Sequence, residues 1–224
     1  MRLASFAANG ATHVGVVDGS SVVSLGLASA GDPRFRTMRH LVGAGAAALA
    51  EARELAESHP AHAAYDVDDV TLLAPLPDPP RVHGRPAGTR FATGPGELVS
   101  PAPDGGLAIG LVAVVDVDAG LFGATILAGA QGPVLVTDDE LRLLGPDLPV
   151  EIRVNGATRC RTAFPQAVAG LERRVEATGP HRAGSLVVLD LPLLTASDTR
   201  PLRDGDEVQV EVAGLGLLRN RIQL

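Results

Sequence analysis

The stretch from Leu107 to Leu127 reads LAIGLVAVVDVDAGLFGATIL and decides how the rest of the chain folds. It holds two apolar runs of strand length, Leu107–Val117 and Leu121–Leu127. A strand with one face in water alternates apolar and polar residues, whereas a strand covered on both faces is apolar along its length. We therefore expect two neighbouring strands inside a sheet that is covered on both faces.

The chain that follows this stretch continues the strand-rich pattern. The dipeptide Asn155-Gly156 separates two runs of alternating residues and predicts a hairpin, because both residue types tolerate a positive φ. Thr137 and Glu140 have the spacing of a capping box, which predicts a short helix over Asp138–Leu143. Three further elements are expected: a helix over Gln166–Ala177 and strands over Leu186–Leu191 and Glu207–Val212.

The chain before this stretch has a different organisation. Asp18-Gly19 predicts a hairpin, and Thr37–Ser58 has Leu and Ala at helical spacing up to a terminating His59-Pro60. Asp66–Leu73 returns to a strand pattern. Four prolines between Pro75 and Pro80 form a stiff connector. We expect a small N-terminal α+β domain at 1–75 and a strand-rich main domain at 76–224, which makes the fold class α+β.

Composition narrows the class of protein. The chain has 224 residues, 46% of them hydrophobic, a net charge of -7 and no lysine. Scattered arginines without a basic cluster argue against nucleic-acid binding. A single cysteine, Cys160, excludes an internal disulfide and a multi-cysteine zinc site. Without a signal peptide or an apolar membrane span, we expect a cytoplasmic protein.

Several segments, in a specific order, resemble the fumarylacetoacetate hydrolase family. The last of them, Arg200–Ile222, is similar to the family's C-terminus of Pro-Leu-x-x-Gly-Asp and a final Leu-Arg-Asn. Earlier segments are similar to its opening strands, its interdomain junction, its Gly-Pro-x-x-x-Thr-x-Asp-Glu stretch and its Val-Asn-Gly hairpin: Met1–Leu25, Val70–Val82, Gly132–Leu141 and Val150–Thr162. The resemblance implies a small N-terminal domain followed by a mixed β roll.

The resemblance also implies a metal site, and here this chain departs from the family's pattern. Relatives hold a divalent cation on a Glu-x-Glu pair and a later Asp, and these positions fall on Ala108, Gly110 and Gly129. A methyl group or a hydrogen atom cannot replace an anionic oxygen ligand. The His-Glu dyad loop of the family has shrunk to His83–Gly88, with no acidic partner. We expect no metal and no cofactor in the family's site.

Acidic residues elsewhere leave one alternative for a metal. Asp116 and Asp118 end the strand that carries Gly110, and alternation places both side chains on one face. They are either a relocated metal pair or the polar end of a strand turning into Ala119-Gly120. A second acidic cluster, Asp138–Glu140, is interpreted as a helix N-terminus, where anions complement the helix dipole.

Five polar residues are the candidates for chemistry without a metal. Asp190 interrupts the apolar run Leu186–Leu191, where relatives line their pocket, and is the preferred acid or base. His83 is a second candidate catalytic residue, with a structural histidine as the alternative. Arg85 and Arg90 flank the shortened loop and are candidates for binding an anionic substrate, with surface arginines as the alternative. Gln131 is a candidate at the pocket mouth, with a residue of a turn as the alternative.

Three functions are compatible with these residues. The first is a metal-independent, remodelled enzyme of isomerase, cyclase or lyase type that acts on a hydrophobic enol, keto or polyene intermediate of a specialised biosynthetic pathway. The second is a non-catalytic pseudoenzyme that binds a metabolite or a partner protein. The third is a metal-dependent hydrolase or decarboxylase that uses Asp116 and Asp118. The expected partner of the first is a small hydrophobic substrate, without nucleic acid or membrane.

The resemblance further implies a homodimer with twofold symmetry, because members of the family commonly associate through the main domain. Light scattering at micromolar concentration is expected to report the mass of two chains. A monomer at that concentration would contradict the expectation.

Overall fold

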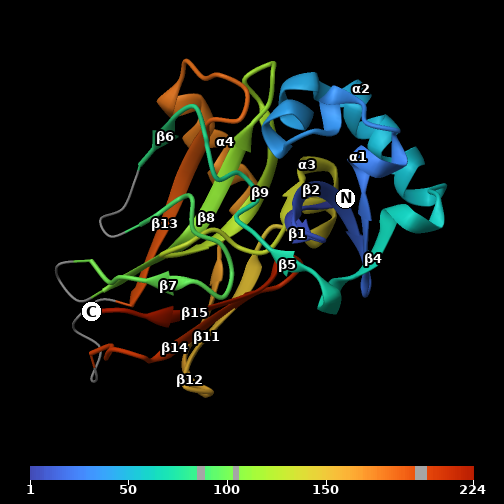
Figure 1. Ribbon diagram of the computed structural model, residues 1–224. Coiled ribbons are helices and arrows are strands. Elements are labelled where there is room, and N and C mark those ends of the chain that lie inside the picture. Colours follow the sequence, from blue (N-terminus) through green and yellow to red (C-terminus); the bar gives the residue numbers. More distant parts are fainter. Residues whose placement is uncertain (85–88, 103–105, 195–200) are drawn as a thin grey trace.

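Two β-sheets with helices packed around them make up the molecule (Figure 1). The computed structural model describes residues 1–84, 89–102, 106–194 and 201–224, and of residues 190–194 it describes the backbone alone. Helices and strands alternate irregularly along the chain, and strands predominate. The expected strand-rich α+β class is confirmed.

The larger sheet, sheet A, has ten strands and runs through the whole molecule. Its path is β4 (Ala64–Asp66), β3 (Ser21–Ser24), β2 (Ala11–Asp18), β1 (Arg2–Ala8), β10 (Leu135–Thr137), β9 (Leu121–Ala128), β8 (Leu107–Val115), β13 (Leu186–Leu194) and β6 (Val82–His83), with β5 (Thr71–Leu72) paired to β1. The β13–β6 pair is parallel, and the other pairs are antiparallel, so the sheet is mixed.

The two apolar runs form β8 and β9, which pair antiparallel in the middle of sheet A. Ile109 and Leu111 pack into a core shared with the smaller sheet, whereas Val112 and Val114 pack into a core shared with helix α2 (Met38–Glu57). Every residue of β9 is buried. The prediction of two strands covered on both faces is confirmed, and removal of their side chains from water on both sides explains why the sequence does not alternate.

The smaller sheet, sheet B, has five strands and one solvated face. Its order is β12 (Ala157–Phe164), β11 (Leu148–Val154), β14 (Glu207–Val212), β15 (Gly216–Ile222) and β7 (Leu98–Val99). On the solvated face the Arg153 guanidinium contacts Glu151 at 2.7 Å and Glu211 at 3.1 Å. The predicted hairpin is confirmed, with Asn155 at φ 49° and Gly156 at φ 77° between β11 and β12.

The N-terminal part contains the expected hairpin, β2–β3, and the expected long helix, α2. A short helix, α1 (Leu25–Ala28), follows β3. The continuous strand expected over Asp66–Leu73 is wrong: β4 and β5 are separated by a 3₁₀ turn at Val67–Asp69. The turn starts where the Asp66 carboxylate accepts a hydrogen bond from the Asp68 N–H at 2.9 Å, a local bond that competes with the strand ladder.

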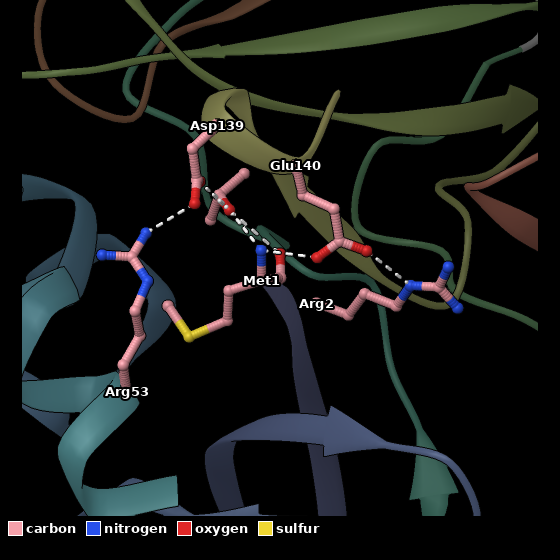
Figure 2. A network of polar contacts seen from close by, with 6 residues as sticks. Met1, Arg2, Arg53, Asp139 and Glu140 are labelled. Carbon is pink, nitrogen blue, oxygen red and sulfur yellow. Dashed lines mark hydrogen bonds and ion pairs between the residues drawn. The ribbon is translucent and has the colours of Figure 1, made fainter. Parts of the chain in front are cut away.

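Helix α3 (Asp138–Leu141) begins at the predicted residue and continues into a 3₁₀ turn at Arg142–Leu144, but the predicted capping box is wrong. The Thr137 hydroxyl does not cap the helix and instead accepts a hydrogen bond from the Met1 ammonium at 2.7 Å (Figure 2). Glu140 pairs with the same ammonium at 2.5 Å and with Arg2 at 3.0 Å. Burial would raise the pKa of Glu140, but these two cations outweigh it and lower that pKa.

Strand β1 joins the N-terminal and main parts of the chain. Arg2 and Leu3 pair with Val136 and Leu135 of β10, so strands from both sides of the proline connector lie in one sheet. The Arg53 guanidinium of α2 adds a contact to Asp139 at 2.8 Å (Figure 2). The division into domains at residue 75 stays a prediction, and the two parts share sheet A.

Helix α4 (Ala167–Thr178) covers the face of β13 and β8 that lies toward sheet B (Figure 1). Its buried residues, Val168, Leu171 and Val175, share a core with Ile109 and Val187. Within the described part of the chain, no helix is long and apolar enough to cross a membrane.

The close approach of β9 and β10 depends on Gly123. A Cβ atom at this residue would lie 2.3 Å from the Val136 carbonyl oxygen and 3.0 Å from the Thr137 Cα, so Gly123→Ala must force the strands apart. We expect a loss of roughly 2–4 kcal/mol in the free energy of unfolding, measured by urea denaturation.

Gly43→Ala in α2 is the matched control. An added Cβ there meets nothing within 4 Å outside the helix. Its free energy of unfolding should stay unchanged or rise by up to ~1 kcal/mol. Equal stability of the two variants would show that β9 and β10 can separate at no cost.

Candidate functional site

The three positions to which the family resemblance assigns metal ligands lie side by side on β8 and just beyond β9. Ile109 pairs with Ala128 and Gly110 with Leu127, and the Gly129 N–H donates to the Ala108 carbonyl at 3.0 Å. Ala108 and Gly110 share the face of Val112, on the α2 side of sheet A. The fold therefore keeps these positions adjacent although their side chains are neutral.

The backbone at Gly129 does not fit a carboxylate ligand. Gly129 has φ 69°, and a Cβ placed on it would lie 2.9 Å from Leu107 Cδ1 and 3.1 Å from Val99 Cβ. Leu107 lies on the sheet B side, so a side chain at Gly129 would point away from the face of Ala108 and Gly110. Among the described residues, those at these three positions do not form a site for a hard cation, which needs several convergent oxygen ligands.

The alternative metal pair, Asp116 and Asp118, forms a turn. The Asp116 carboxylate accepts hydrogen bonds from the N–H groups of Asp118 at 2.9 Å and Gly120 at 2.7 Å. This closes the β8–β9 hairpin and is the local bonding that aspartate favours in turns. Among the described residues, no group of three or more His, Cys, Asp or Glu side chains is arranged to hold a metal ion.

Asp190 occupies the position on β13 that pairs directly with Gly110. Val188, two residues earlier on the same strand, belongs to the α2-side core together with Val112 and Leu127. The side chain of Asp190 lies outside what the structure describes, and so does the whole of Arg85. The backbone register brings Asp190 next to Gly110, and its role as an acid in a pocket stays a prediction.

The segment after the shortened loop returns to the same place. The Arg90 N–H donates to the Gly129 carbonyl at 3.1 Å, while the Arg90 side chain is exposed. The next residue, Phe91, is buried in the α2-side core with Leu127 and Val188. Arg90 therefore stands at the rim of the region around Gly110 and Gly129.

Gln131 is fully buried, and its amide is bonded to backbone. Its Nε2 donates to the carbonyls of Leu76, at 2.7 Å, and of Phe91, and its Oε1 accepts from the Leu76 N–H at 3.3 Å. These bonds fasten the proline connector and the 91–93 segment to the end of β9. A substrate could reach this amide only by displacing them, so the geometry gives Gln131 an architectural role.

His83 lies away from these residues, on the other face of sheet A. It pairs with Val187, which packs on the α4 side, and its ring meets the His181 ring edge-to-face with centroids 4.9 Å apart. Burial, with the nearby His181 and Arg81, lowers the pKa of His83. The structure therefore brings Asp190 and the Arg90 backbone to the neutral positions but separates His83 from them.

Sequence reasoning did not identify His181 as a site residue. Its Nε2 donates to the Val175 carbonyl at the end of α4, at 2.7 Å, which leaves Nδ1 as the free ring nitrogen. His181 follows Gly179-Pro180 and precedes Arg182, and this Gly-Pro-His-Arg segment was the available signal. Its approach to His83 comes from the pairing of β6 with β13, which no local pattern predicts.

Comparisons with known proteins place the fold. Residues 121–223 match the family model described as fumarylacetoacetate (FAA) hydrolase C-terminal. The structure is similar to that of maleylpyruvate hydrolase from Sphingobium sp. SYK-6 in complex with manganese(II) ion and pyruvate, with TM-score 0.73, 16% identity and coverage of 99% of this chain and 98% of that chain. No curated protein matches the chain in sequence.

Two further solved structures are similar over their whole length. One is fumarylacetoacetate hydrolase from Exiguobacterium antarcticum, with TM-score 0.70, 20% identity and coverage of 100% of this chain and 99% of that chain. The other is 5-carboxymethyl-2-hydroxymuconate delta-isomerase from Mycobacterium smegmatis, with TM-score 0.62, 20% identity and coverage of 99% of both chains. The resemblance to the fumarylacetoacetate hydrolase family is confirmed.

The geometry of the site generates a prediction about metals. Titration calorimetry with Mg²⁺ or Mn²⁺ is expected to show only heats of dilution, because neutral residues occupy all three positions and Gly129 cannot direct a side chain toward the other two. Asp116→Ala tests the relocated pair, with Asp69→Ala as a matched exposed carboxylate. A stoichiometric isotherm that only Asp116→Ala abolishes would establish the relocated site.

Proposed function

We propose that this chain, with the fold and C-terminal sequence of fumarylacetoacetate hydrolases, is a metal-independent enzyme of isomerase, cyclase or lyase type. Its substrate is a hydrophobic enol, keto or polyene intermediate of a specialised biosynthetic pathway, and its site lies over Gly110. The observation that carries the proposal is the register of β13. Asp190 is the only ionisable residue in β8, β9 and β13, and it pairs with Gly110, where relatives place a ligand.

Burying a charged side chain in an apolar strand costs free energy, so such a residue needs a partner or a function. The function that we propose for Asp190 is proton transfer. The Asp190 carboxylate removes a proton from a carbon next to a carbonyl group, and the electron pair moves onto the carbonyl oxygen. The carboxylic acid so formed returns the proton to a different carbon, so the step isomerises the substrate without a co-reactant.

Arginine takes the place of a metal in this scheme. The negative charge that develops on the substrate oxygen needs a fixed positive group, and a guanidinium offers a planar set of donors. Arg90 starts from the backbone bond to Gly129, within the region of the site, and Arg85 precedes it in the same loop. We assign both to substrate binding and leave His83 out of the site, because it faces α4.

The kinds of reaction known for this fold support the proposal. Solved structures with the fold are described as a hydrolase of maleylpyruvate and an isomerase of 5-carboxymethyl-2-hydroxymuconate. Both names denote unsaturated acids with a keto or enol function. We carry over that class of chemistry and propose that this chain performs it on a more hydrophobic compound, since Val112, Leu127 and Val188 share the face of Gly110.

A non-catalytic binding protein is the second candidate, and two observations favour it. The Gln131 amide is engaged by backbone, and the Gly129 position is packed against Leu107 and Val99. Such packing stabilises a scaffold without supplying chemistry. In this alternative the same region binds a metabolite or a partner protein, and Asp190 contributes a hydrogen bond or an ion pair only.

Small molecules carried by the purified protein provide the test. Protein purified in EDTA is denatured, the released compounds are identified by mass spectrometry, and each is resupplied to fresh enzyme in EDTA. We expect conversion by the wild type and a decrease of roughly 10²–10⁴-fold in kcat for Asp190→Asn. Asp69→Asn, an exposed carboxylate outside the site, should match the wild type.

Each departure from this result has a separate meaning. Turnover that EDTA abolishes contradicts the metal-free scheme. Turnover that survives in Asp190→Asn contradicts the assignment of the acid and base. A compound that binds stoichiometrically but returns unchanged supports the non-catalytic candidate.

A further inference from the structure

A second cleft lies on the face of sheet A opposite Gly110, and the proposed reaction does not use it. Its volume is about 380 Å³, which is within the range of small-molecule sites. Two segments far apart in sequence form its walls, the end of the proline connector and the connection from α4 to β13. The lining residues are Pro80, Arg81, Pro180, His181, Arg182 and Ser185.

The lining is basic and contains no acidic residue. Arg81 and Arg182 are both exposed, and neither forms an ion pair within the described part of the chain. Arg174 of α4 lies beside the end of β6, with Nη2 3.4 Å from a Cβ placed on Gly84. A cluster of unpaired guanidinium groups on a chain with net charge -7 calls for an anionic partner from outside the chain.

Two histidines add titratable donors to the same place. His181 lines the cleft, and His83 stacks against it edge-to-face. Nδ1 of His181 and Nε2 of His83 are both buried and have no hydrogen-bond partner among the described residues. Each of these nitrogens is therefore a hydrogen-bonding group that the described residues leave unused.

The walls of the cleft are held in place by backbone hydrogen bonds. The Leu186 N–H donates to the Arg81 carbonyl at 2.8 Å, and the Ser185 N–H donates to the Arg182 carbonyl at 2.9 Å. The Val115 N–H at the end of β8 donates to the Ser185 carbonyl at 3.0 Å. Arg81 and Arg182 therefore start from fixed points on the two walls, so little order has to be imposed when a ligand binds.

A further pair of charged groups lies beside the cleft. Arg39 of α2 lies 3.8 Å from Asp78 of the connector, and its Cγ is 3.7 Å from a Cβ placed on Gly184. Asp78 is thus engaged by a different arginine and does not line the cleft. The balance of charge facing the cleft remains positive.

We propose that this cleft is a binding site for a small ligand that carries a doubly charged oxyanion group, held by Arg81, Arg182 and His181. Two guanidinium groups match two negative charges, and each offers paired donors to oxygen atoms. Phosphate monoesters and dicarboxylates share this chemistry. The site lies across β13 from the proposed catalytic residue, so its occupation and turnover at Asp190 can be measured separately.

The test uses the two histidines as reporters. Imidazole signals of the full chain are followed by NMR while inorganic phosphate is added at constant ionic strength, near pH 6 and again near pH 7.5, where most of the phosphate is doubly charged. We expect a saturable change at His83 and His181 with a millimolar dissociation constant. Since Arg81 contributes to lowering the pKa of His83, a bound anion should move that pKa upward. Succinate in place of phosphate distinguishes a preference for phosphate from one for dicarboxylates.

Variants of arginine inside and outside the cleft decide whether the cleft binds the anion. Arg81→Gln with Arg182→Gln should weaken binding at least tenfold, and Arg182→Lys, which keeps the charge but loses the planar fork, should weaken it less. Arg159→Gln, on exposed β12 in sheet B, should leave the dissociation constant within twofold. Thermal melts of every variant exclude unfolding as the cause.

Several results would overturn the proposal. They are a change that stays linear with phosphate up to tens of millimolar, equal weakening by Arg159→Gln, and unaltered binding in the double variant. Chloride at the same ionic strength producing the same saturable change would show general screening and would also overturn it.

Discussion

The burial of β8 and β9 on both faces is the constraint on which the rest of the structure depends. A strand that contacts apolar cores on each side can carry almost no polar side chain, because every unpaired polar group there loses its hydration. Sheet B and α4 supply one cover, and α2 with Phe91 supplies the other. Within this arrangement Asp190 on the neighbouring strand is an exception that requires an explanation, and chemistry at Gly110 is the explanation we favour.

The same packing fixes the backbone just beyond β9. In this chain Gly129 adopts a positive φ and approaches Leu107 and Val99 too closely for a side chain. Restoring an acid there would therefore require a change of backbone as well as of residue type. Gln131, two residues later, stabilises the resulting loop through bonds to Leu76 and Phe91. The conformation at Gly129 and the bonds of Gln131 thus belong to one packed region.

Sheet A separates two regions with different physical character. The face around Gly110 is apolar, and its described polar groups come from the rim, whereas the cleft at Arg81 and Arg182 is basic and open to solvent. Strand β13 connects them, since its residues point alternately to either side. A ligand in the basic cleft would contact the connection that leads directly into the strand carrying Asp190.

The sequence by itself determined the class of fold and most elements, because apolar patterns and turn dipeptides such as Asn155-Gly156 act locally. It also indicated Asp190, since one charge in an apolar strand is visible without a structure. The sequence wrongly predicted that Thr137 caps a helix. Its hydroxyl instead accepts a hydrogen bond from the Met1 ammonium, at the other end of the chain. Only the tertiary structure decided that His83 faces α4, that it meets His181 and that Gln131 is buried. Those facts depend on the pairing of β6 with β13 and on contacts between residues far apart in sequence, which local residue patterns do not encode.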